Sequence, residues 1–354
     1  MKTYRVLIAP LDWGLGHATR CIPIIQLLLE KGYEVHVASS GDAQRLLQLE
    51  FPQLKQFSLP SYKVGYSQRL PFMLKVFLQL PKFLLVIIKE NKVIKQITNQ
   101  NRYDLIISDN RYGCHSSIVK SVFICHQLNI IMPSLIAWMA PVINYVNHLW
   151  ISRFDQCWIP DDSTASLTGR LTKPALPNSE WIGVLSRFGK DESAATEFQL
   201  AVLLSGPEPQ RSVFEKKILH QLSGLKLKSI LVRGRLDVNP IEKENQHLMV
   251  INYLHGEELQ NIIEKSEVVL CRSGYSTIMD LVKLQKKAVF VPTPGQTEQE
   301  YLGFRLMQNG IALCQRQNEF NIVQALKEIK NYTGFVGSLS ETNLLNNAID
   351  KVLK

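Results

Sequence analysis

A histidine stands directly after two closely spaced glycines near the start of the chain, in the segment Trp13-Gly14-Leu15-Gly16-His17. Apolar side chains recur at helical spacing over 17–31, so His17 is predicted in the first turn of a helix. The positive end of the helix dipole disfavours protonation there and keeps the imidazole neutral near pH 7. Such an imidazole can take a proton from a hydroxyl group, so His17 is a candidate general base. The alternative is a histidine that only caps or packs.

Two further titratable side chains follow predicted strands. Asp109 comes directly after the strand 105–108, and His126 comes directly after the strand 122–125. Both therefore lie at predicted carboxyl ends of sheet strands, where ligands bind in open α/β sheets. Either residue would orient the hydroxyl group of a substrate or be the general base itself. The alternative for both is a hydrogen bond within a turn.

Two loops in the second half of the chain have the character of anion sites. The first is LSGPEPQ over 204–210, followed by Arg211, and the second is RSGYST over 272–277. In each loop, small residues lead from a predicted strand into a predicted helix. The first N–H groups of a helix bind anions, and the arginine beside each loop adds a positive charge that fits phosphate. Two such loops in one domain predict a diphosphate ligand.

An acidic residue follows the second loop by one helical turn. Thr277 and Asp280 have the spacing of a capping box, in which threonine is followed three residues later by an acid. The other role open to Asp280 is to accept a hydrogen bond from a sugar hydroxyl.

Neither a dinucleotide cofactor nor a metal ion is indicated. A dinucleotide-binding loop has the pattern G-x-G-x-x-G, and an acid after the second strand binds the ribose. Here position 19 is threonine instead of the third glycine, and no acid follows the strand 34–38. No D-x-D triplet occurs, and the six cysteines form no C-x-x-C pair, so neither a metal bridge nor a disulfide framework is expected. Arg233, Arg272 and the helix starts would then balance the diphosphate charge.

The order of strand-like and helix-like segments predicts an α/β fold with two Rossmann-like domains. We expect an N-terminal domain over 1–190, a C-terminal domain over 197–335, and a final helix over 341–354 that closes the second domain or crosses back to the first. The predicted strands are 4–9, 34–38, 105–108, 122–125 and 157–159 in the first half, and 200–204, 229–232, 247–251, 268–271 and 288–291 in the second.

The positive charge is concentrated in one stretch. The chain has a net charge of +9, and residues 62–102 hold eight Lys or Arg against Glu90 alone. The apolar runs in this insert of about 60–102 are shorter than the ~20 residues that span a bilayer. The segment therefore either docks on an anionic membrane surface or packs on its own domain with solvated lysines. No nucleic-acid motif occurs, so no nucleic-acid partner is expected.

The segment 271–312, CRSGYSTIMDLVKLQKKAVFVPTPGQTEQEYLGFRLMQNGIA, resembles the donor-binding segment of inverting GT-B glycosyltransferases of the family 28 type. That family includes bacterial lipid-intermediate N-acetylglucosaminyltransferases and galactolipid synthases. The resemblance implies two Rossmann-like domains facing each other across a cleft, with the acceptor held by the first and a UDP-sugar by the second. The family commonly has Glu where Asp280 stands and a Gln pair where this chain has Gln299-Glu300.

The resemblance also assigns roles to individual residues. Gly206 and the loop 272–277 would hold the UDP diphosphate, and Asp280 would meet the ribose. Tyr253 and Leu254 would contact the uracil base, and Gln299 and Glu300 would contact the donor sugar. The predicted catalytic residues are His17, Asp109 and His126, and the predicted binding residues are Gly14, Gly16, Gly206, Gln210, Arg211, Arg233, Tyr253, Leu254, Arg272, Ser273, Gly274, Ser276, Thr277, Asp280, Gln299 and Glu300.

The expected function is therefore metal-independent transfer of a hexosyl or N-acetylhexosaminyl group from a UDP-sugar to a hydroxyl of a lipid-linked or cell-envelope glycan precursor. One alternative is a UDP-sugar hydrolase of a nonulosonic-acid pathway, because GLGHATRC over 14–21 is similar to the Gly-x-Gly-His-x-x-Arg-Cys signature of those enzymes. A second alternative is a non-catalytic nucleotide-sugar-binding protein. The strand-like N-terminus predicts a cytoplasmic protein, peripheral on the inner face of the membrane if the basic insert docks there.

Overall fold

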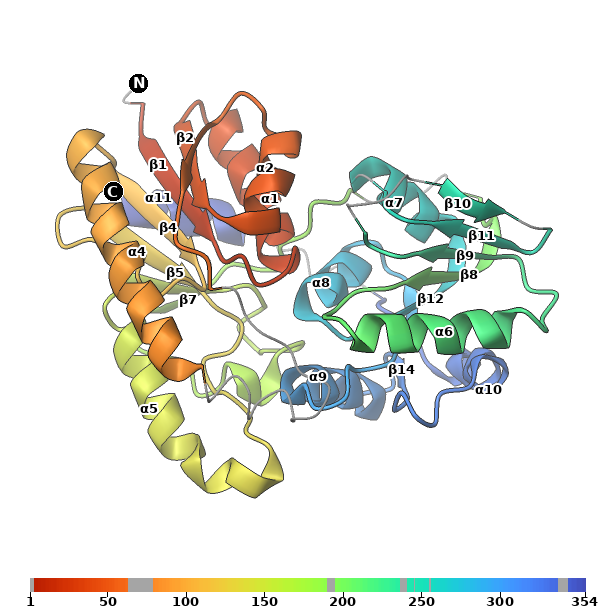
Figure 1. Cartoon of the computed structure of the whole chain (residues 1–354). Coiled ribbons are helices and arrows are strands. Elements are labelled where there is room, and N and C mark those ends of the chain that lie inside the picture. Colours follow the sequence, from red (N-terminus) through yellow and green to blue (C-terminus); the bar gives the residue numbers. More distant parts are fainter. Residues whose placement is uncertain are drawn as a thin grey trace. The chain divides into compact units, whose positions relative to one another are not determined.

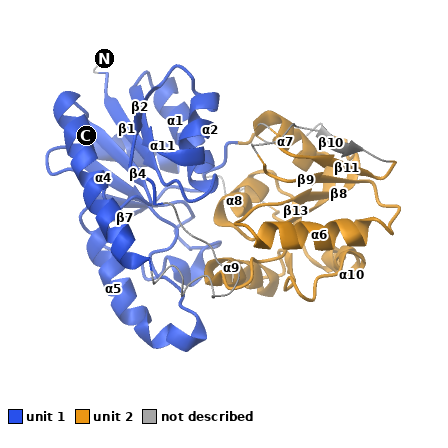
Figure 2. Cartoon of the chain, viewed as in Figure 1, with its two compact units in different colours: residues 1–65, 73–187, 339–354 blue, residues 66–72, 188–338 orange. Residues whose placement is uncertain are grey.

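The computed structural model describes residues 3–62, 79–189, 195–235, 241–244, 246–254, 256–336 and 343–354. These residues form two compact units (Figure 2). Unit 1 contains the described residues up to 187 together with 343–354, and unit 2 contains those from 188 to 336. Each unit is built around one sheet of mostly parallel strands with helices beside it (Figure 1).

The sheet of unit 1 has seven strands, and every neighbouring pair is parallel. Residues 6–9, in an interior strand, are completely buried, as expected for a parallel strand that is covered on both faces. In spatial order the strands are β3 (Lys55–Ser58), β2 (Glu34–Ser39), β1 (Arg5–Pro10), β4 (Leu105–Asp109), β5 (Lys120–Ile124), β6 (Gln156–Ile159) and β7 (Ser179–Trp181).

The helices of unit 1 cover this sheet with apolar faces. Helix α1 buries Cys21, Ile24, Ile25 and Leu28, which recur at helical spacing, and Gly32 ends it with a φ of +73° that favours glycine. The helices are α1 (Gly16–Glu30), α2 (Gly41–Glu50), α4 (Leu80–Gln100) and α5 (Ala140–Ile151), with 3₁₀ turns at Ser134–Met139 (η1) and Gly169–Leu171 (η2).

The C-terminal helix α11 (Leu344–Leu353) belongs to unit 1, which resolves the choice left open by the sequence. Lys31 Nζ lies 2.8 Å from Asp350 Oδ1, and Lys120 Nζ donates to the Val352 carbonyl oxygen over the same distance. The last residues of the chain therefore complete the first unit.

Part of the predicted basic insert is the helix α4. Its buried side chains include Phe83, Val86 and Ile94, so one face packs on unit 1. The opposite face exposes Leu85 and Ile88 to solvent. Residues 63–78 of the insert lie outside the described residues. In the part of the chain that is described, no helix is long and apolar enough to cross a bilayer.

Unit 2 has a second seven-stranded sheet, which is parallel except for the pair β10 and β11. In spatial order the strands are β10 (Ile241–Glu244), β11 (Leu248–Ile251), β9 (Ser229–Val232), β8 (Phe198–Leu203), β12 (Ser266–Cys271), β13 (Lys287–Phe290) and β14 (Leu313–Cys314). The helices are α6 (Gln210–Leu222), α7 (Gly256–Glu264), α8 (Tyr275–Lys283), α9 (Thr297–Gln308) and α10 (Ile322–Glu328), followed by the 3₁₀ turn η3 (Ile329–Asn331).

The first strand of each unit has the next strand along the chain on one side and a later strand on the other. In unit 1, β1 lies between β2 and β4, and in unit 2, β8 lies between β9 and β12. These are topological switch points, where the loops at the carboxyl ends of the strands diverge and ligands bind. The glycine loop before His17 follows β1, and the loop that contains Gly206 follows β8, so both lie at these points.

Candidate active site

The structure brings the three predicted catalytic residues together at the switch point of unit 1. His17 lies in the first turn of α1, and Asp109 is the last residue of β4. Asp109 pairs in register with Pro10, the last residue of β1, so the two strands end level. His126 follows β5 and lies next to the same cluster.

His17 and Asp109 form a direct pair. Nδ1 of His17 lies 3.0 Å from Oδ1 of Asp109. The carboxylate is fully buried, whereas 15% of the His17 side chain is exposed. Asp109 is therefore placed to orient the imidazole rather than to touch an incoming substrate.

Electrostatics keep Asp109 ionised. Burial by itself would raise the pKa of this carboxyl, but the charge of Arg20 and the hydrogen bonds from Arg20 and His17 outweigh burial. The pKa of Asp109 is consequently held well below its usual range. An ionised carboxylate only accepts hydrogen bonds, so it can receive the N–H of His17.

The pKa of His17 lies below its ordinary value of 6.5. Burial of the ring is the largest cause, and the nearby charge of Arg20 acts in the same direction, against the opposing effect of Asp109. The imidazole is therefore neutral near pH 7, as predicted from the helix start. The leading cause in the structure is burial rather than the helix dipole.

Arg20 completes the cluster and was given no role in the sequence analysis. Its side chain is 2% exposed. Nε donates to Oδ2 of Asp109 over 2.7 Å, Nη2 bonds Oδ1 of the same carboxylate, and Nη1 lies 2.9 Å from Nδ1 of His126. Two signals were available: Arg20 is the arginine of the Gly-x-Gly-His-x-x-Arg-Cys signature, and it lies three residues after His17, a spacing that places both on one face of a helix.

The glycine loop before α1 leaves room at the site. Gly14 has a φ of +84°, in the region that favours glycine, and a Cβ added there would meet no atom within 4 Å. Gly16 is the first residue of the helix. The loop thus exposes backbone beside His17, as a ligand-binding loop requires.

In unit 2, the first predicted anion loop has its glycine exposed at the end of β8. Gly206 has a φ of +100°, and a Cβ added there would lie 3.5 Å from the hydroxyl oxygen of Thr293, on the loop after β13. Gln210 is the first residue of α6. The backbone of this loop is therefore open to a ligand at the switch point.

The two arginines expected to bind phosphate near this loop are occupied by carboxylates. Arg211 Nε donates to Glu208 over 2.8 Å and its Nη1 donates to Glu215 over 2.9 Å. Arg233 Nε donates to the other oxygen of Glu215 over 2.6 Å. The predicted roles of Arg211 at phosphate and of Arg233 in balancing the diphosphate charge are corrected, because both guanidinium groups pair with carboxylates of unit 2.

Arg272 also requires correction. Its side chain is 1% exposed, and Nη1 donates to the carbonyl oxygens of Val291 and Pro292 over 2.9 and 3.1 Å. The guanidinium stacks 4.3 Å from the ring centre of Phe214, and burial lowers its pKa to about 10. The side chain joins β12, β13 and α6, and it does not present its charge at the loop that follows it.

The backbone of that second loop nevertheless has the predicted arrangement. Gly274 is the N-cap residue of α8, so Ser276 and Thr277 lie in its first turn. Because Thr277 does not occupy the N-cap position, the capping-box role of Asp280 is wrong. Ser273 donates from Oγ to the Gln299 carbonyl oxygen over 2.7 Å, which links this loop to α9.

The residues predicted to meet the sugar and the base lie at the same edge of the sheet. Gln299 and Glu300 are in the first turn of α9, where their side-chain oxygens accept hydrogen bonds from the backbone N–H groups of Thr293 and Gly295. Tyr253 and Leu254 follow one residue after the end of β11. Asp280 lies in the second turn of α8, and the other predicted binding residues of unit 2 lie in the loops or first helical turns that follow the strands.

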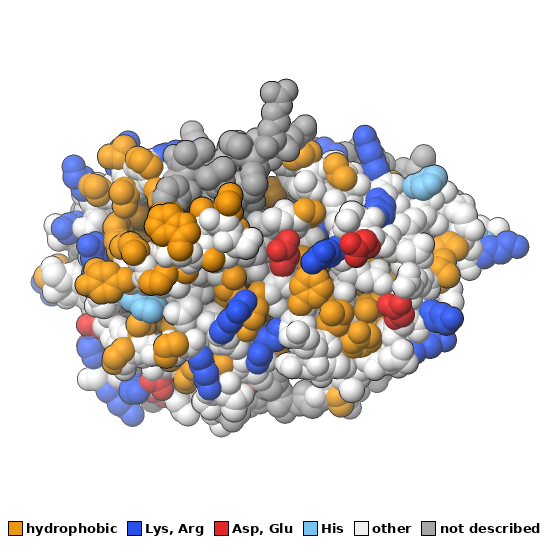
Figure 3. Space-filling model, turned by 90° about the horizontal axis from the view of Figure 1, so that it is seen from below, with side chains coloured by type: hydrophobic (Ala, Val, Ile, Leu, Met, Phe, Trp, Pro, Cys, Tyr) orange, Lys and Arg blue, Asp and Glu red, His pale blue; other side chains and the backbone are white. Residues whose placement is uncertain are grey.

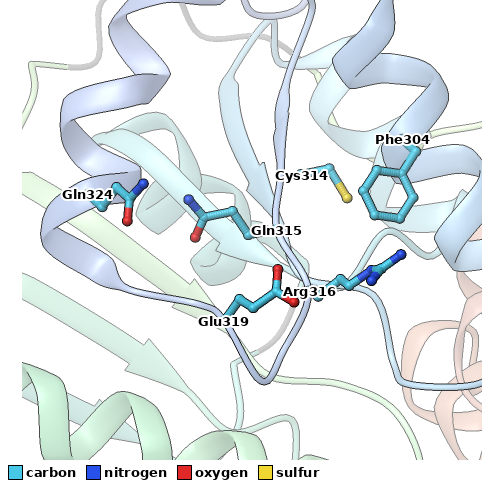
Figure 4. A pocket seen from close by; sticks show the side chains of 6 residues that line it. All are labelled: Phe304, Cys314, Gln315, Arg316, Glu319 and Gln324. Carbon is cyan, nitrogen blue, oxygen red and sulfur yellow. The ribbon is translucent and has the colours of Figure 1, made fainter.

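Unit 2 also has a pocket of about 380 Å³ away from these residues (Figure 4). It lies beside the end of β14, and none of its lining residues belongs to the predicted donor-binding set. Burial raises the pKa of Cys314 in its wall to about 12, so that thiol is not a nucleophile. The pocket is lined by Phe304, Cys314, Gln315, Arg316, Glu319 and Gln324.

Comparison with known proteins agrees with this geometry. Residues 210–334 match the family model of the glycosyltransferase family 28 C-terminal domain. The UDP-N-acetylglucosamine--N-acetylmuramyl-(pentapeptide) pyrophosphoryl-undecaprenol N-acetylglucosamine transferase of Haemophilus ducreyi is 22% identical over 329 residues, which cover 88% of this chain and 86% of that protein. The transferase of the same description from Rickettsia felis is also 22% identical, over 89% of this chain and 87% of its own length.

Solved structures show the same fold. The kitacinnamycin glycotransferase superimposes with a TM-score of 0.69 at 13% identity and covers 100% of both chains. The glycosyltransferase SnogD from Streptomyces nogalater superimposes with a TM-score of 0.64 at 14% identity, over 99% of this chain and 94% of its own.

The fold and these relatives define a glycosyltransferase with the GT-B fold. Within that class, residues 210–334 are a family 28 C-terminal domain. The α/β fold, the family resemblance and the transferase class predicted from the sequence are thereby confirmed. The comparisons give no support to the hydrolase or to the non-catalytic binding protein.

Proposed function

We propose that the protein transfers a hexosyl or N-acetylhexosaminyl group from a UDP-sugar to a hydroxyl group of a lipid-linked glycan precursor, with inversion at the anomeric carbon. The observation that carries this proposal is the His17–Asp109 pair at the switch point of a family 28 type glycosyltransferase. The donor and acceptor classes follow from the relatives, which are named for UDP-N-acetylglucosamine and for a pyrophosphoryl-undecaprenol acceptor.

The proposed step balances as a single displacement. The acceptor hydroxyl gives its proton to Nε2 of His17 while its oxygen bonds the anomeric carbon of the sugar. The bond between that carbon and the diphosphate oxygen breaks, and UDP leaves with the electron pair. Asp109 accepts the Nδ1–H bond of His17 and stabilises the imidazolium that forms.

Unit 2 supplies the donor contacts in this proposal. The N–H groups of the Gly206 loop and of the α8 start would hold the diphosphate, and Asp280 would accept from the ribose. Tyr253 and Leu254 would lie at the base, and Gln299 with Glu300 at the sugar. Arg272 supports these loops by its hydrogen bonds to the carbonyl oxygens of Val291 and Pro292. Helix starts and N–H groups then carry the charge of UDP without a metal ion.

A panel of UDP-sugars, each with and without a lipid extract, tests the proposal by the rate of UDP release. We expect release that depends on both the matching donor and the lipid acceptor. Equal release with water as the only acceptor would instead identify a hydrolase.

We further propose that unit 1 docks on the inner face of the cytoplasmic membrane. The segment from η1 to α5 exposes large apolar side chains, of which Leu135 is 86% and Trp138 77% exposed. Figure 3, which views the molecule from below Figure 1, shows apolar side chains gathered on the left part of the visible surface. The exposed apolar residues of η1 and α5 are Leu135, Trp138, Val142, Tyr145, Val146 and Leu149.

The helix α4 adds positive charge to exposed apolar side chains. Lys82 and Lys89 are exposed on the same helix as Leu84, Leu85 and Ile88, a combination that suits anionic headgroups and acyl chains. This helix therefore packs on unit 1 with one face and offers a membrane-binding face with the other.

Sedimentation with vesicles tests the docking proposal. The double change Leu135→Ala and Trp138→Ala, or Lys82→Gln with Lys89→Gln, should release the protein from vesicles of anionic phospholipid. The matched controls in unit 2, Val323→Ala and the pair Lys216→Gln with Lys226→Gln, should not. Equal vesicle binding by all these proteins would contradict docking through α4 and α5.

A further inference from the structure

We propose that Arg20 is a positioning residue that holds Asp109 against His17 and fixes the opposite tautomer on His126, and thereby makes His17 the base of the site. The inference takes its catalytic meaning from the proposed function, whereas the tautomers themselves are properties of the protein without substrate. It is based on the contacts of one buried guanidinium with a carboxylate and two imidazoles.

The first step concerns His17. Its Nδ1 lies 3.0 Å from Asp109 Oδ1 and 3.0 Å from Arg20 Nη2, and one nitrogen cannot donate to the first and accept from the second. Nη2 of Arg20 already donates to Oδ1 of Asp109, so it does not need Nδ1 of His17 as an acceptor, whereas an unprotonated Nδ1 would place two acceptors against each other at the Asp109 contact. Nδ1 therefore carries the proton and donates it to Asp109, which leaves the lone pair of the neutral ring on Nε2.

The second step concerns His126, where the guanidinium itself sets the tautomer. Arg20 Nη1 lies 2.9 Å from Nδ1 of His126. A guanidinium has donors and no acceptor, so Nδ1 of His126 must accept. The proton of the neutral His126 ring is then on Nε2, and the ring has no basic nitrogen left to take a proton from a hydroxyl group.

The third step is the shape of the arginine. Nε and Nη2 bond the two oxygens of Asp109, which fixes the plane of the guanidinium and directs Nη1 to His126. This forked geometry cannot be reproduced by a lysine, whose three donors radiate from one nitrogen. The position therefore requires the planar group as well as its positive charge.

The charged and titratable neighbours of His17 agree with these tautomers. They are Arg20 and Cys21 from α1, Asp109 from β4, and His126 from the segment after β5. Cys21 Sγ donates to Asp109 Oδ2 over 3.6 Å, and burial raises the pKa of this thiol well above its usual value, so it stays neutral. Of these neighbours, Arg20 and Asp109 are the ionised groups, and their charges balance each other.

Nitrogen-15 NMR of histidine-labelled protein tests the tautomers directly. Signals of the two rings are assigned with His17→Gln and His126→Gln. In the unsubstituted protein near neutral pH, we expect the Nδ1–H form for His17 and the Nε2–H form for His126. The opposite form on either ring would overturn the proposal, and this measurement needs no variant of Arg20 to fold.

Arg20→Lys then tests the arginine itself. We expect His126 to become a mixture of tautomers while His17 keeps the Nδ1–H form, because the ammonium still pairs with Asp109 but cannot serve both partners. The matched control is Arg111→Lys, a second fully buried arginine of unit 1 that lies two residues after β4 and whose Nη1 is 2.6 Å from Glu90 Oε1. The control should leave both rings unchanged, and an unchanged His126 ring in Arg20→Lys would overturn the role of Arg20.

Kinetics separate this inference from the proposed function. Arg20→Lys should lower kcat roughly 10- to 100-fold with little change in the KM for the donor, less than the ~10⁴-fold loss known for a complete tautomer error in a catalytic triad. Predicted tautomers in a protein that transfers no sugar would refute the proposed function alone. Efficient transfer by a protein with the opposite tautomers would refute this inference alone.

Discussion

Arg20 in unit 1 and Arg272 in unit 2 are both buried beside a glycine loop at a switch point, yet they have different partners. Arg20 contacts a carboxylate and two imidazoles that are able to exchange protons. Arg272 contacts backbone carbonyl oxygens, the side chain of Gln317 and the ring of Phe214. A buried arginine therefore indicates chemistry only when its partners can titrate, and otherwise it indicates loop architecture.

The comparison makes a direct prediction for the base. His17→Ala should lower turnover roughly 10²- to 10⁴-fold and leave the affinity for UDP unchanged, because in the proposed mechanism the imidazole transfers the proton and unit 2 holds the donor. Steady-state kinetics and calorimetry with UDP measure the two effects. Turnover equal to that of the unsubstituted protein would remove His17 from the mechanism.

The carboxylate of Asp109 should contribute to the stability of unit 1. Asp109→Asn leaves Arg20 as a buried charge without its partner, and breaking a buried ion pair in this way costs about 3–5 kcal/mol of unfolding free energy. Urea denaturation followed by circular dichroism checks this value. A change below about 1 kcal/mol would show that the ion pair is not buried as described.

In unit 2 the corresponding prediction concerns binding instead of turnover. Asp280→Ala should weaken UDP binding by ~1–3 kcal/mol, because a ribose hydroxyl would lose its acceptor. Asp280→Asn keeps one acceptor oxygen and should lose less. Unchanged UDP affinity in both variants would remove Asp280 from the donor site.

The pH dependence of the rate distinguishes a neutral His17 from a protonated one. Because burial places the pKa of His17 below 6.5, kcat/KM should be constant above that pH and fall only at lower pH, as the imidazole becomes protonated. A rate profile between pH 5 and 8 tests this. An acidic limb with a midpoint above 6.5 would contradict a buried, neutral His17.

The sequence predicted the parts of this site that depend on strand order. Asp109 and His126 were expected at a sheet edge because parallel strands end on the same side, and both lie there beside His17. The role of Arg20 was missed because its three partners come together only through the packing of α1 against β4 and β5. Local spacing shows that Arg20 shares a helix face with His17, and it does not show what that face meets.

The errors in unit 2 have a related physical cause. Arg272 directly precedes a glycine loop and a helix start, which is the local pattern of a phosphate site. The direction of its side chain is decided by the ring of Phe214 and by carbonyl oxygens from the end of β13, which are distant in sequence. Helix α5 was not predicted because large apolar side chains such as Leu149 lie on its exposed face, so the usual contrast between a buried and a polar face is absent.

The proposed role of His17 is to activate a lipid-linked hydroxyl group toward a UDP-sugar, and the fate of a labelled sugar tests this role most directly. UDP-sugar labelled in the sugar is incubated with anionic vesicles that contain lipid extract, and label is counted in the organic and aqueous phases. We predict one labelled lipid for each UDP released, with this transfer lost in His17→Ala. Label recovered as free sugar in the aqueous phase, or transfer unaffected by His17→Ala, would contradict the account.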